Sequence, residues 1–269
     1  MNTVNQLLQR LIVHVNMSTL SPAAQAIVEK YLQLPLVGTK VNAPYFNNQR
    51  SKVRAGLAAL IGKGNPEDIA LEAELTARTK HFPITTATAT DVKKFLVEQN
   101  LGVDCSAFAY YVLRYEGIVK NKKDLQSSLH FPQAKSLFRK LIVRLRPVEN
   151  ISVAVLGDDH NSRVITKKEI QAGDLLFFWN TGLDKKLNHL LVVTEVNENT
   201  LTYAHSFRWR NEGQYDHGVR TGTITWKNTT TSLLDDTWTE KNTTGAENDT
   251  WQHAREAAKF EIRRLKILE

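Results

Sequence analysis

The sequence predicts an α+β fold in which helices pack on an antiparallel sheet. The first half of the chain carries apolar residues at helical spacing, and Ser, Asn, Thr or Asp residues that cap helices precede these stretches. From about residue 171, short apolar runs alternate with polar turns, which is typical of strands joined in hairpins. The chain has 269 residues, enough for one large domain, and we expect a single domain over 1–269.

Helices are expected first over residues 1–40. Leu7, Leu11 and Val15 recur at helical spacing, and Ser21-Pro22 combines a capping serine with a first-turn proline. A helical insertion is expected over about 50–100. In it, Asn65-Pro66 and Thr90-Asp91 have the composition of helix starts.

The stretch GVDCSAFAYYVLR contains the only cysteine of the chain. Its apolar residues recur with the period of one helix face, at Cys105, Phe108, Ala109, Val112 and Leu113. Asp104 is then a natural cap and Gly117 a natural end. The thiol is therefore expected in the first turn of an amphipathic helix.

The strands are expected in the second half of the chain. A turn at Gln171–Asp174 leads into LLFFW, and the run His189–Val196 forms a second strand. LTYAHSF follows the polar turn 197–200, and GTITW begins at Gly222. The segment of about 228–250 is polar and expected to be loop-rich. KFEIRRLKIL closes the chain as a strand or a helix.

Composition and charge restrict the class of protein. A single cysteine excludes an intramolecular disulfide framework and a cysteine-rich zinc site, and we expect neither a metal nor another cofactor. The net charge of +7 favours anionic partners such as an acidic cell-wall polymer, or serves only as a solvated cationic face. No zinc-finger spacing, phosphate loop or aromatic RNA-binding signature is present, so no specific nucleic-acid partner is expected. Neither a transmembrane run nor a secretory signal is expected, and the compartment stays open.

Four segments carry a resemblance to a known family. GVDCSAFAYYVL, QAGDLLFF, NHLLVV and LTYAHS occur in the order seen in the NlpC-type cell-wall cysteine peptidases, which are papain-like amidases. NAPYFNN resembles the Pro-Tyr element that precedes the cysteine helix of that family. The resemblance implies a papain-like core and hydrolysis of an amide bond through a thioester. The implied substrate is a peptidoglycan stem peptide, often at the γ-D-glutamyl–diamino-acid bond.

The resemblance also implies roles for single residues. Cys105 matches the nucleophile, His189 the base, and His205 the residue that orients the base. Tyr45 matches the tyrosine near the oxyanion. Asp104 and Ser106 match residues that shape the substrate pocket.

The strand register decides whether the two histidines share a face of the sheet. A five-residue loop that pairs Glu195 with Leu201 places His189 and His205 on one face, whereas a four-residue loop places them on opposite faces. The sequence does not decide between these two registers.

Departures from the family pattern leave the substrate open. Ala107 stands where the family usually has glycine, and about sixty residues separate Tyr45 from Cys105. We expect this insertion to border the substrate cleft. One alternative is the same fold acting as a deamidase, transpeptidase or acyltransferase on another acyl substrate. The other is a noncatalytic module that binds a polyanion.

Overall fold

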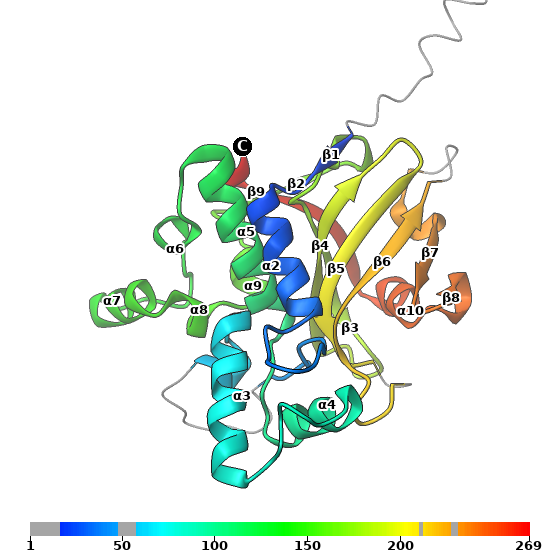
Figure 1. Cartoon of the computed structure of the whole chain (residues 1–269). Helices are drawn as coiled ribbons and strands as arrows, with labels where there is room; N and C mark the ends of the chain where they lie inside the picture. The colour runs from blue at the N-terminus through cyan, green and yellow to red at the C-terminus, as the bar shows by residue number, and fades with distance from the viewer. Residues whose placement is uncertain (1–16, 48–57, 210–211, 227–230) are drawn as a thin grey trace, which may run out of the picture.

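The computed structural model describes residues 17–47, 58–209, 212–226 and 231–269. It confirms a mixed fold of helices and antiparallel sheet (Figure 1). The helix expected around Leu7–Val15 lies outside the described residues. The longer helices of the first half, α2, α3, α4 and α5, precede most of the sheet in the sequence. The change from helical spacing to short apolar runs predicts this order.

The helices of the described residues are α2 (Pro22–Leu32), α3 (Pro66–Lys80), α4 (Ala89–Glu98), α5 (Cys105–Asn121), α6 (Leu125–Ser128), α7 (Leu137–Leu145), α8 (Pro147–Asn150), α9 (Val153–Leu156) and α10 (Asp249–Glu256). Short 3-10 turns are η1 (Ala58–Ile61), η2 (Lys167–Glu169), η3 (Leu233–Asp235), η4 (Gly245–Glu247) and η5 (Lys266–Leu268). Within these described ranges, no helix combines the length and the apolar character needed to cross a bilayer.

Local capping chemistry sets the helix starts. The side chains of Ser21 and Asn65 accept hydrogen bonds from backbone N–H groups of α2 and α3, as expected. The cap of α4 is Thr88 rather than Thr90. The expected end of α5 at Gly117 is wrong. The helix continues to Asn121 and ends at Lys122, which adopts a left-handed φ of 53°.

Nine strands of the described residues form the sheet: β1 (Ser18–Thr19), β2 (Ser162–Ile165), β3 (Leu175–Thr181), β4 (Leu187–Val196), β5 (Thr200–Phe207), β6 (Gly218–Thr225), β7 (Thr237–Glu240), β8 (Thr243–Thr244) and β9 (Lys259–Leu265). Their order is β2-β9-β3-β4-β5-β6-β7-β8, and β1 pairs with β4. The C-terminal stretch is thus a strand that ends in a 3-10 turn. The described part of 228–250 adds two strands to the sheet edge, so it is more regular than expected.

The two faces of the sheet carry separate hydrophobic cores. We call the face covered by α2 and α5 the helical face; it includes Leu190, Val192 and Ala204. We call the opposite face the aromatic face; it includes Phe178 and Trp238 and is partly covered by α10. Figure 1 shows α2 and α5 on one side of the sheet and α10 on the other.

Candidate functional site

The thiol lies at the start of α5, where the sequence predicts it. Cys105 is the first residue of the helix, and the Asp104 carboxylate accepts a hydrogen bond from the backbone N–H of Ala107. The position of a cysteine at a helix start favours a lowered thiol pKa. The structure reverses that expectation: burial, together with the nearby Asp104 carboxylate, raises the pKa of Cys105 from 9.0 to about 12. Lys63 and the backbone N–H groups of Leu190 and Ser106 oppose this rise without overcoming it.

A buried lysine completes the polar cluster beside the thiol. Lys63 Nζ lies 2.6 Å from Asp104 Oδ2 and donates to Ser106 Oγ at 2.8 Å. It also donates to the carbonyl of Ile151 at 2.9 Å, and Ser106 donates to Asp104 Oδ1 at 2.8 Å. Sequence reasoning missed Lys63, because its GKG context carries no functional pattern and only the fold brings it to Asp104. The buried ammonium of Lys63 and the buried carboxylate of Asp104 neutralise each other, which offsets the cost of burying either charge alone.

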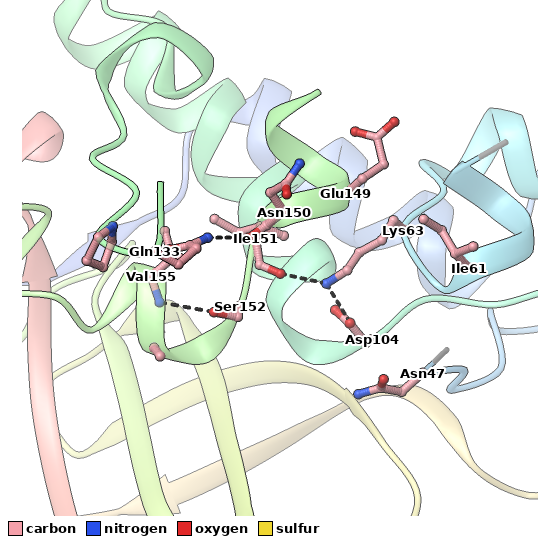
Figure 2. Close-up of a pocket in the computed structure, with 12 residues that line it drawn as sticks. Asn47, Ile61, Lys63, Asp104, Gln133, Glu149, Asn150, Ile151, Ser152 and Val155 are labelled. Atoms are coloured by element: carbon pink, nitrogen blue, oxygen red, sulfur yellow. Dashed lines mark hydrogen bonds and ion pairs between the residues drawn. The ribbon is translucent and has the colours of Figure 1, made fainter. Parts of the chain in front are cut away.

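An open cleft of about 580 Å³ begins at this cluster. Figure 2 shows Lys63 joined both to Asp104 and to the backbone of Ile151. Most of the other polar lining of the cleft consists of amide side chains. The lining residues are Asn47, Ile61, Lys63, Asp104, Pro132, Gln133, Glu149, Asn150, Ile151, Ser152, Ala154 and Val155.

The two expected histidines contact each other. His189 Nε2 lies 2.8 Å from His205 Nδ1, and His205 Nε2 lies 3.0 Å from Glu240 Oε2. A register shift between Val193 and Glu195 produces this arrangement. The turn starts with Val196 paired to Leu201, but beyond the bulge Val193 pairs with Tyr203. The two histidines therefore share a face, although the connecting loop has the shorter length.

That shared face is the aromatic face. The ring of His189 packs against Phe178, Phe207 and Trp209, and its side chain is fully buried. Burial, followed by the nearby His205, lowers the pKa of His189 well below 6.5. Its Nδ1 atom has no hydrogen-bond partner. This imidazole is therefore neutral and enclosed.

Among the described residues, no hydrogen bond joins Cys105 to His189. Cys105 belongs to the core of the helical face, whereas His189 packs against rings of the aromatic face. The reason is the period of two along a strand, which sends the next residue, Leu190, toward α5 instead. The Leu190 N–H is the strand group that interacts with the thiol. No interaction within the described ranges joins Cys105 to an imidazole.

Glu240 terminates the polar chain on the aromatic face. Burial alone would raise its pKa, but the neighbouring His205 and Arg220 hold the pKa of Glu240 at about 2. The carboxylate also accepts hydrogen bonds from Tyr203 and Thr250. The sequence placed Glu240 in a polar loop, and only the pairing of β7 with β6 brings it to His205.

The three residues expected to bind substrate occupy different places. Asp104 lines the cleft, and Ser106 lies behind it in the Lys63 cluster. Tyr45 forms an isolated bridge with Val103, but its ring packs on Phe207 at 5.0 Å. The Tyr45 backbone therefore lies beside Val103, which Lys63 also bridges, while the Tyr45 ring packs on the aromatic face.

One group of three potential metal ligands occurs among the described residues, at His130, Asp158 and His160. His160 Nδ1 lies 2.9 Å and His130 Nδ1 lies 3.6 Å from Asp158 Oδ1. These His–Asp contacts account for the clustering, and neither the thiol nor the His189–His205 pair belongs to it.

Comparison with known proteins identifies the family. No curated protein and no solved structure matches the chain. The model of the NlpC/P60 family matches residues 92–242, more than half of the 269 residues, including the cysteine helix and the strands β3 to β6. Members of this family are in general cysteine peptidases or amidases of cell-wall metabolism. The chain therefore belongs to the NlpC/P60 family.

Proposed function

We propose that this chain binds a peptide of the cell wall, such as a peptidoglycan stem peptide, in the cleft beside Cys105. The observation that carries the proposal is the open cleft at the start of α5, on a face of the sheet where Leu190 rather than an imidazole meets the thiol. A binding module of the family fold accounts for both features. This proposal corresponds to the noncatalytic alternative predicted from the sequence, except that the ligand is the peptide typical of the family instead of a simple polyanion.

The lining of the cleft suits a peptide. Asn47, Gln133 and Asn150 carry amide groups, which can donate to peptide carbonyls and accept from peptide N–H groups. The charged lining consists of Glu149 and the Lys63–Asp104 ion pair, and a stem peptide carries carboxylates and an amine. The net charge of +7 would strengthen association with an anionic wall polymer.

A binding measurement tests this proposal. Isothermal titration of the chain with soluble muropeptides should show saturable binding. Gln133→Ala combined with Asn150→Ala should weaken it about tenfold, because two polar contacts are lost. Gln252→Ala on α10 serves as the matched control, since Gln252 lies away from the cleft. Equal binding by the double variant and the control would contradict the proposal.

Hydrolysis at Cys105 is the second candidate, and family membership favours it. The thiol would attack the substrate carbonyl, release the amine and form a thioester, which water would then hydrolyse. Backbone N–H groups of Leu190 and Ser106 interact with the sulfur and favour its thiolate form. In this mechanism His189 and His205 would have to act as base and orienting residue, which requires the imidazole to reach the other face of the sheet.

A digest of purified cell wall separates the two candidates. Mass spectrometry should find no new amine or carboxylate ends after incubation with the chain if it only binds. New ends that disappear with Cys105→Ala would establish hydrolysis, at the bond that the fragments identify. Deamidation or acyl transfer would give products with a different mass change.

A further inference from the structure

The helix α7 presents an unusual apolar surface to solvent. The exposed fractions of Leu137, Phe138, Leu141 and Leu145 are 85%, 72%, 55% and 69%. Figure 1 shows α7 at the periphery of the molecule, on the side away from the sheet. Large apolar side chains clustered in this way mark an interaction site.

These four side chains lie on one side of the helix. At 3.6 residues per turn, positions 137, 138, 141 and 145 fall within an arc of about 100°. Val143, which is buried against the protein, lies roughly opposite the centre of that arc. The helix is therefore anchored by one side, and its most apolar side faces outward.

Basic residues border the apolar arc along one edge. Lys140 and Arg144 lie along that edge and are exposed, whereas Arg139 is also exposed but lies nearer the side of Val143. Lys135 adds exposed positive charge just before the helix, whereas the exposed Arg146, just after it, pairs with Glu149 at 3.0 Å. From Ala134 to Val148 the chain has no acidic residue. An apolar stripe with a basic edge, on a helix without acidic residues, is the pattern of a helix that lies in the surface of an anionic membrane.

We propose that α7 docks this protein onto an anionic lipid surface, with Leu137, Phe138, Leu141 and Leu145 inserted among the acyl chains. Charge complementarity selects this occupant. A second copy of α7 would bring like charges together, because the segment contains no acid. A polyanion in solution would bind the basic edge but leave the apolar arc in water. A bilayer with anionic headgroups satisfies both.

Vesicle co-sedimentation tests the docking. The full chain should bind phosphatidylcholine vesicles that contain one third phosphatidylglycerol. Binding to pure phosphatidylcholine should be much weaker, and salt should reduce the difference. Phe138→Glu with Leu141→Glu should lower the affinity by roughly tenfold or more, because two inserted apolar side chains are lost. Lys140→Gln and Arg144→Gln should each lower it about fivefold on the anionic vesicles.

Leu71→Glu provides the matched control, because Leu71 is an exposed leucine on another helix, α3, with an exposed fraction of 58%. It should bind vesicles as the unchanged chain does, and circular dichroism should give the same helix content for all variants. Absence of binding to the anionic vesicles would overturn the proposal. So would an equal loss of binding with Leu71→Glu, or a concentration-dependent dimer that Phe138→Glu dissociates.

Discussion

The two faces of one sheet hold the two halves of the chemistry expected from the sequence. The helical face contains the thiol of Cys105, the Lys63–Asp104 pair and the open cleft. The aromatic face contains the His189–His205–Glu240 chain, sealed among aromatic rings. Successive residues of a strand point to opposite faces of a sheet. The family order of a thiol and an imidazole therefore does not by itself fix the face on which each lies.

The largest expected effect concerns the reactivity of the thiol. Because the pKa of Cys105 is raised from 9.0 to about 12, its thiolate fraction near neutral pH should be about a thousandfold lower than that of an ordinary cysteine. Alkylation by iodoacetamide, followed by mass spectrometry, should be correspondingly slow in the folded chain and normal in urea. His189→Ala should leave the rate unchanged. Rapid alkylation at mildly acidic pH that depends on His189 would show that Cys105 and His189 act as a catalytic pair. It would contradict the separation of the two groups on opposite faces of the sheet.

The next effect concerns the stability of the aromatic face. Glu240→Ala should lower the free energy of unfolding by about 3–5 kcal/mol, because it removes one of the two carboxylates that pair with the buried Arg220 and leaves the buried hydroxyls of Tyr203 and Thr250 without their acceptor. Urea denaturation measures the change. Glu247→Ala, at an exposed position in η4, should change it by less than about 0.5 kcal/mol. Similar values for the two variants would mean that the Glu240 network contributes little.

A histidine placed on the helical face would sharpen the comparison. Leu190→His should put an imidazole beside the thiol and raise the alkylation rate near neutral pH roughly tenfold or more, since a nearby cation lowers a thiol pKa by about one unit or more. Leu191→His is the matched control, because Leu191 points to the aromatic face. Equal rates in both variants would show that strand alternation does not control access to Cys105.

The smallest effect is the pH dependence of stability. His189 has a pKa well below 6.5 in the folded chain and His217 a pKa of about 4, so the unfolded chain takes up more protons as the pH falls below 6.5. The free energy of unfolding should therefore decrease as the pH falls from 6.5 to 5. His189→Gln should reduce the slope of the free energy of unfolding against pH by up to about 1.4 kcal/mol per pH unit. Urea unfolding at several pH values measures it, with exposed His81→Gln as the control. An unchanged slope in His189→Gln would contradict a neutral, enclosed imidazole.

Local sequence signals predicted much of the fold. Asp104 caps α5 and Cys105 begins it, because a short acidic side chain before an amphipathic run satisfies the free N–H groups of a helix start. The strands around His189 and His205 follow from apolar runs between polar turns. The family order of these segments was likewise visible in the sequence, and the NlpC/P60 match confirms it.

The sequence alone determined where α2, α3 and α5 begin, where the runs of β3, β4 and β5 lie, and that the one cysteine begins a helix, because capping and periodicity act within a few residues of the chain. Only the tertiary structure decided that Lys63 pairs with Asp104 and that Glu240 reaches His205, because those partners are far apart in the sequence. It also decided the face of each histidine. The bulge between Val193 and Glu195 sets the β4–β5 register, and the packing of α5 on Leu190 and Val192 fixes which face the thiol meets. A shift of one residue would reverse that outcome, and no pattern along the chain specifies it.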